Sequence, residues 1–111
     1  MEAHIGGNLP LSEQFYTAAK DWAEKEAAAD LLEQTKSAVM AQRQAMLGDL
    51  PVNRSEQIVK ASPDWSEHVE VIVAARREAN LAKVRMEFLR MKHAEHQSAE
   101  ANQRTEARLM S

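Results

Sequence analysis

Ser62-Pro63-Asp64-Trp65 is the clearest helix start in the chain, and it opens a run to Ser111 that contains no glycine and no further proline. A serine can accept a hydrogen bond from a first-turn amide, and proline suits the first helical position because its φ is fixed and it lacks an N–H. Asp64 lies near the positive end of the helix dipole. We therefore expect one long helix over about residues 63–108. Such a helix cannot bury its apolar face against one compact core, so a hairpin, bundle or coiled coil is expected.

The first half of the chain has the pattern of a second long helix that ends in a turn. We expect this helix over about residues 11–47, ended by Gly48, because glycine adopts the left-handed backbone conformation that other residues resist. Pro51 marks the turn that follows. Residues 1–10 show little periodicity and are expected to form a flexible arm, which leaves residues 11–111 as a single helical-hairpin domain.

A short connecting helix is expected over about residues 54–61. Asn53 is a suitable N-cap, and Glu56 follows it in the capping-box position. The helix should end before Ser62, because the residue before a proline is disfavoured in the α region. The two long helices should then be antiparallel, since the connection folds the chain back.

Apolar residues of the last helix recur at alternating steps of three and four. We call this set the seam, and it consists of Ile72, Ala75, Ala79, Ala82, Met86 and Leu89. Its alanines would let another helix approach closely. A rougher register in the first helix comprises Ala18, Ala28, Leu32, Thr35, Val39 and Met46. Further apolar residues lie off the seam, namely Val69, Val73, Val84, Phe88 and Met91.

The apolar surface of the last helix is therefore wider than a two-stranded coil needs, which predicts a second layer from this chain or from another copy. The expected fold is an all-α antiparallel hairpin with a short connecting helix and a long coiled-coil-like C-terminal helix. We expect it to be completed by oligomerisation through the seam.

Composition limits the class of protein. Fourteen Lys and Arg residues stand against 17 Asp and Glu, so the net charge of −3 gives no overall attraction to nucleic acid. Cysteine is absent, which excludes disulfides and thiolate metal sites and is compatible with a reducing compartment. No signal sequence or membrane span is evident. We expect a soluble cytoplasmic protein that does not contact the membrane.

Positive charge is concentrated in the last helix. The basic residues there are Arg76, Arg77, Lys83, Arg85, Arg90 and Lys92. One interpretation is that they pair with the acidic first half of the opposite helix and fix the register of the hairpin. The other is that they bind a partner, either a protein or the phosphates of DNA. Phe88 is the only aromatic residue among them that could stack on a base.

Motifs for catalysis or for cofactors are absent from the sequence. No glycine-rich phosphate loop is present, and the carboxylates are scattered over helix positions that should face solvent. His93, His96 and Glu100 have a spacing that can hold a metal ion, but such histidines are more often interface residues. We expect no metal, no cofactor and no enzymatic activity. Trp22 and Trp65 are expected to be core anchors.

Two segments resemble a group of small helical proteins encoded by tailed bacteriophages and prophages. They are Ala61-Ser62-Pro63-Asp64-Trp65-Ser66-Glu67-His68-Val69-Glu70 and Ala75-Arg76-Arg77-Glu78-Ala79-Asn80. Weaker matches extend the resemblance over about residues 20–108. Members of the group are encoded beside single-strand annealing recombinases and exonucleases. The resemblance offers no catalytic residues, and it implies a phage protein that acts near DNA processing in the host cytoplasm.

Two functional hypotheses follow. In the first, the protein is a non-enzymatic, homo-oligomeric accessory of phage recombination or replication, which binds a recombinase, an exonuclease or DNA. In the second, it inhibits a host defence nuclease, as anti-CRISPR proteins do, by protein–protein binding, with the acidic residues between Asp21 and Glu33 mimicking phosphate. The sequence leaves open whether the acidic first helix or the basic last helix carries the binding.

Overall fold

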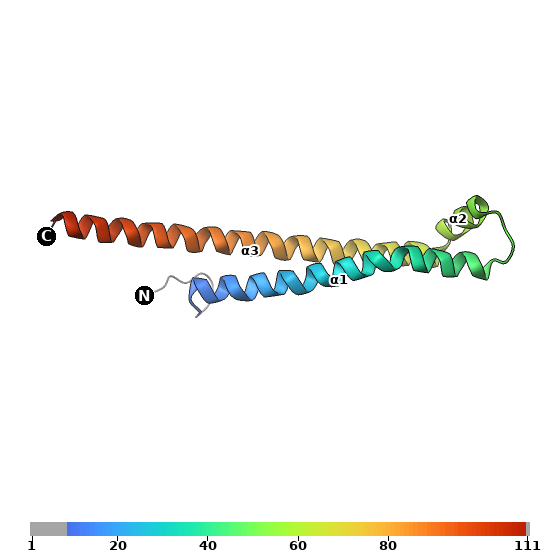
Figure 1. Cartoon of the computed structure of the whole chain (residues 1–111), viewed down its shortest axis with the longest axis horizontal. Coiled ribbons are helices and arrows are strands. Elements are labelled where there is room, and N and C mark those ends of the chain that lie inside the picture. Colours follow the sequence, from blue (N-terminus) through green and yellow to red (C-terminus); the bar gives the residue numbers. More distant parts are fainter. Residues whose placement is uncertain (1–8, 111) are drawn as a thin grey trace. The chain divides into compact units, whose positions relative to one another are not determined.

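The computed structural model describes residues 9–110, and every regular element in that range is a helix (Figure 1). α1 spans Leu11–Met46, α2 spans Val52–Lys60 and α3 spans Pro63–Met110. α3 packs against α1, which confirms the expected all-α helical hairpin. The arm expected over residues 1–10 lies almost entirely outside the described residues. Leu9 is exposed, and the Pro10 carbonyl accepts the first backbone hydrogen bonds of α1.

The hairpin consists of two compact units that share the long helices. One unit is Glu24–Ala79 and contains the second part of α1, all of α2 and the first part of α3. The other combines the chain up to Ala23 with the chain from Asn80 onward. We call them the turn unit and the terminal unit.

The helix ends at the turn follow the backbone rules that the sequence predicted. The Trp65 amide donates a hydrogen bond to Ser62 Oγ at 3.3 Å, so Ser62 caps α3 as expected. Gly48 has a φ of +80°, the left-handed conformation expected of the residue that ends α1. The last helical residue of α1 is Met46, one residue before the predicted end.

The expected capping box of the connecting helix is wrong. α2 begins at Val52, because Pro51 has a φ of −54° and its carbonyl already accepts the Ser55 amide at 3.0 Å. Asn53 therefore lies inside the first turn, and no side chain caps this helix. Ser55 is buried, and its hydroxyl accepts a hydrogen bond from Gln44 Nε2 at 3.0 Å. This bond ties α2 to the end of α1.

Each unit has its own set of buried apolar side chains. In the terminal unit, Leu11, Ala18, Met86 and Leu89 form a buried cluster, and Trp22 packs against it half-buried. In the turn unit the buried apolar residues are Ala29, Val59, Trp65, Ile72 and Ala79. The tryptophans thus contribute to the packing of both units, as expected for core anchors.

Candidate binding surface

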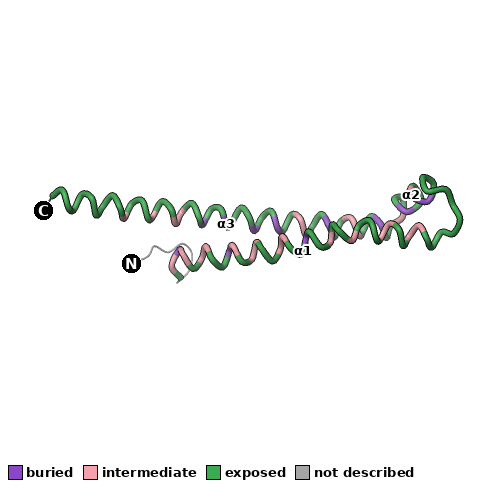
Figure 2. Tube along the Cα trace, in the orientation of Figure 1, coloured by how far each residue is buried: buried purple, intermediate pink, exposed green. Residues whose placement is uncertain are grey.

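The seam of α3 is covered by α1 of the same chain. Ile72, Ala79, Ala82, Met86 and Leu89 are buried, and Ala75 is half-buried. Buried and half-buried positions recur along α3, whereas residues 101–110 are exposed throughout (Figure 2). The face that the sequence offered for oligomerisation is therefore already occupied within one hairpin, and a second copy needs another surface.

Arg76 is held by three carboxylates of α1 in the turn unit. Its Nη1 donates to Glu26 Oε1 at 2.8 Å, and its Nη2 donates to Asp30 Oδ1 at 2.6 Å. Glu33 receives two bonds, from Nε and Nη2, both at 2.9 Å. The acids are spaced four and three residues apart, so they lie on one face of α1. Of the two interpretations of the basic residues, pairing across the hairpin therefore applies to Arg76.

The contacts in this cluster shift the pKa values of both Glu33 and Arg76. The hydrogen bonds from Arg76 and its positive charge lower the pKa of Glu33 below its ordinary value of 4.5. The hydrogen bonds to Glu33 and Asp30 raise the pKa of Arg76 further above its usual range. Arg76 is therefore permanently charged and engaged within the hairpin, which removes it from the residues available to a partner.

The Arg76 cluster should make the stability of the turn unit depend on pH in the acidic range. Because Glu33 has a lower pKa in the folded state than in the unfolded state, its stabilising contribution is present above pH 4.5 and is lost as the pH falls through the lowered pKa. Arg76→Gln should lower the melting temperature at pH 7 and flatten the decline in melting temperature below pH 4.5. Thermal unfolding followed by circular dichroism between pH 3 and pH 7 measures both.

Arg77→Gln is the matched control, since Arg77 is exposed and forms no ion pair with any residue between 9 and 110. It should unfold like the wild type at each pH. Equal acid sensitivity in the wild type and in Arg76→Gln would show that the cluster does not carry this dependence.

The other five predicted basic residues point outward or contact aromatic rings. We call them the α3 cations, and they are Arg77, Lys83, Arg85, Arg90 and Lys92. Lys83 Nζ lies 5.9 Å from the ring centroid of Trp22. Lys92 Nζ is 3.3 Å from Glu95 Oε2 and 5.7 Å from the ring centroid of Phe88. Within the described chain, Arg77, Arg85 and Arg90 have no carboxylate partner. Unlike Arg76, these cations are presented at the surface.

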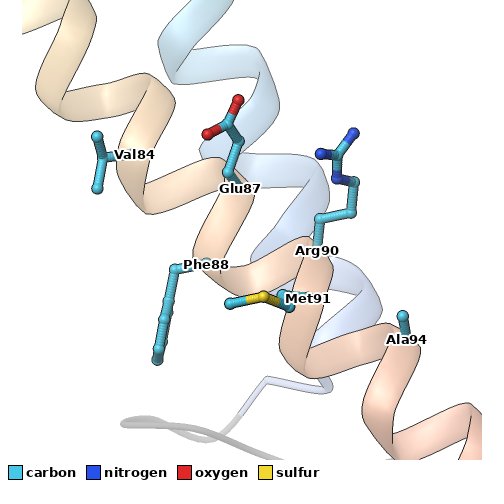
Figure 3. Close-up of a pocket in the computed structure, with 6 residues that line it drawn as sticks. All are labelled: Val84, Glu87, Phe88, Arg90, Met91 and Ala94. Carbon is cyan, nitrogen blue, oxygen red and sulfur yellow. The ribbon is translucent and has the colours of Figure 1, made fainter.

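The terminal unit also exposes apolar side chains on the side of α3 away from its seam. Leu81, Val84, Phe88 and Met91 have exposed fractions of 58%, 63%, 44% and 57%. We call them the exposed stripe. Figure 3 shows Val84, Phe88 and Met91 projecting from α3, where they line a shallow groove together with Glu87, Arg90 and Ala94. The sequence analysis listed Val84, Phe88 and Met91 among the apolar residues off the seam but did not include Leu81. With Leu81 added, the four residues follow one another at intervals of three and four.

The histidines near the end of α3 do not form a metal centre. His96 Nε2 lies 3.4 Å from Glu100 Oε1. Nowhere in residues 9–110 does a group of three histidine or acidic side chains come together in a way that could hold a metal ion. His93, His96 and Glu100 are thus placed on α3 without forming such a group.

Comparisons with known proteins give no match to a family model, to a curated protein or to a solved structure. As for membranes, none of the helices described between residues 9 and 110 combines the length and the apolar character that a crossing requires.

Proposed function

We propose that the protein is a non-enzymatic helical accessory of phage DNA recombination or replication, and that it holds single-stranded DNA through the α3 cations. The observation that carries this proposal is the exposed charge between residues 77 and 95. Five cations stand there against Glu78, Glu87 and Glu95, the last of which pairs with Lys92, and this leaves a local net charge of +2 on a chain whose total is −3. Phosphates would be attracted to this segment and repelled by the rest of the chain.

Two further features support DNA as the ligand. Phe88 lies among the α3 cations with 44% of its surface exposed, so a base could stack on its ring. Arg77 also lies in one of the two segments that resemble phage proteins encoded beside annealing recombinases and exonucleases, and the weaker matches cover the other α3 cations. The resemblance supplies the biological context, and the exposed charge supplies the chemistry.

The alternative of a nuclease inhibitor that mimics phosphate finds less support. The carboxylates of Glu26, Asp30 and Glu33 are all directed at the guanidinium of Arg76. A phosphate mimic has to present its charges to a partner, whereas these three carboxylates are paired with Arg76 inside the hairpin. Inhibition by another surface stays open as a hypothesis.

The test is fluorescence anisotropy with a labelled single-stranded oligonucleotide at about 50 mM and about 200 mM salt. If all five α3 cations contact phosphates, affinity should fall on the order of 100-fold between the two conditions, because each phosphate contact on a single strand contributes about −0.7 to the salt slope. The double variant Arg85→Glu/Arg90→Glu should lose at least about tenfold in affinity at the lower salt, since it replaces attraction by repulsion.

The matched control is Lys36→Glu/Arg54→Glu, which changes the net charge equally at exposed positions of the turn unit. It should bind nearly as well as the wild type. No binding at either salt would contradict the DNA contact and turn the search to a protein partner such as a recombinase or exonuclease. Equal losses in both double variants would show that net charge, and not this surface, governs binding.

A further inference from the structure

We infer that the exposed stripe of α3 is the contact for a second copy of this chain, with the two α3 helices side by side. The inference moves the expected oligomer contact from the seam, which α1 covers, to the opposite face of the same helix. It does not depend on DNA binding, because the contact is formed by the apolar face of α3 and the charged residues at its edges, without any phosphate.

The spacing of the stripe fits a helix–helix contact. Leu81, Val84, Phe88 and Met91 follow one another at intervals of three, four and three residues, which is the a/d pattern of a coiled coil. All four are exposed in the single hairpin, and the groove beside Phe88 is shallow and mainly apolar. A face of this kind buries its side chains only when another helix lies on it. α3 would then be the middle layer, with α1 on one side and the second copy on the other.

The charges beside the stripe favour a second α3 over an unrelated helix. Glu87 lies next to Phe88 on one edge of the stripe. Lys92 lies next to Met91 on the other edge, five residues after Glu87. In a parallel coiled coil, charges with this spacing meet across the interface, so Glu87 of each copy would face Lys92 of the second copy. The chain is thus complementary to itself at this contact.

An antiparallel pair is also complementary to itself. With Leu81 packed against Met91 of the second copy, Glu78 would face Lys92 of the second copy, and Arg77 would face Glu95. Arg85 and Glu87 would then each meet their own counterpart, which offsets part of this attraction. Opposite charges therefore meet across the stripe in either direction, and charge swaps distinguish the two directions.

The dimer has a consequence for the proposed function. It would bury Phe88 and place Lys92 beside a carboxylate of the second copy, so a dimer would hold DNA through phosphate contacts of the remaining α3 cations and not by stacking on Phe88. The stripe is only about three helical turns long, smaller than the contact of a permanent dimer, so we expect association to depend on protein concentration.

The test is sedimentation equilibrium of the full chain without nucleic acid, over a wide range of protein concentration. The wild type should rise from the 12.5 kDa mass of one chain towards twice that value. Val84→Gln/Phe88→Gln should stay monomeric and retain its helical circular dichroism, because both residues are exposed in the single hairpin. Leu31→Gln/Val71→Gln is the control, since it removes equally exposed apolar residues outside the stripe and should dimerise like the wild type.

Two charge swaps test the contact and its direction. Lys92→Glu should weaken the dimer at least about tenfold, because it places a second carboxylate beside Glu87 of a parallel partner or Glu78 of an antiparallel one. Adding Glu87→Lys in the same chain should restore a parallel dimer, and adding Glu78→Lys should restore an antiparallel one. A wild type that is monomeric at every concentration would overturn the inference. A dimer unaffected by Val84→Gln/Phe88→Gln would also overturn it, and so would a dimer that neither charge swap restores. DNA binding by a strictly monomeric protein would separate the failure of this inference from that of the proposed function.

Discussion

Leu89→Ala is expected to lower the free energy of unfolding of the terminal unit by about 2–5 kcal/mol, the usual cost of removing a buried leucine side chain. Leu89 is 4% exposed and belongs to the buried cluster of Leu11, Ala18 and Met86. That cluster has few members, so the neighbours have little means of filling the cavity. Because whole domains are stable by only about 5–15 kcal/mol, this loss should largely open the terminal unit.

Urea unfolding followed by circular dichroism, at one fixed protein concentration, measures the effect. Leu31→Ala is the matched control, since Leu31 is 64% exposed on α1, and its change should stay within about 0.5 kcal/mol. Amide hydrogen exchange should show the loss of protection concentrated in the terminal unit for Leu89→Ala. If the two variants lost the same stability, Leu89 would not be a core residue of this hairpin.

Ala79→Leu is expected to cost about 1–3 kcal/mol for the opposite reason, because it adds volume where none is free. Ala79 on α3 and Ala29 on α1 are both fully buried in the turn unit. Small side chains at such positions let two helices approach closely, and a leucine there would push the backbones apart. Leucine and alanine have similar helix propensities, so the change should report packing and not helix formation.

The control for this substitution is Ala74→Leu, which lies on an exposed position of α3 in the same unit. Its stability should stay within about 0.5 kcal/mol of the wild type. Thermal unfolding of the two variants side by side distinguishes them. A stable Ala79→Leu protein would mean that α1 and α3 lie farther apart at this point than the burial of Ala79 requires.

The sequence predicted the α3 side of the hairpin better than the α1 side. Ser62 and Gly48 mark helix ends through backbone rules that hold in any context, and the seam has one clear three-and-four pattern. In α1, the expected register used Ala28, whereas the structure exposes Ala28 and buries Ala29. Three successive alanines offer nearly equal choices to a packing helix, so periodicity alone cannot select the buried one.

The candidate site was predictable as a set of residues but not as a set of contacts. The sequence places six basic residues on the last helix, and only the axial position of α3 against α1 decides that Arg76 meets the acids while Arg77 does not. That position depends on how the chain turns through α2, whose start was predicted two residues late because Pro51, not Asn53, precedes it. Local signals determined the helices, and tertiary packing determined the pairings.

The connection through α2 also has a consequence for how the chain assembles. Gln44 and Ser55 are 11 residues apart, Arg43 and Asp64 are 21 apart, and Glu33 and Arg76 are 43 apart. Leu11 and Leu89 come from still more distant parts of the sequence. Closing a longer loop costs more chain entropy, so the hairpin should close first beside α2 and last in the terminal unit. The exposed stripe and most of the α3 cations therefore lie on the late-forming part of the protein, where a bound partner adds stability by mass action.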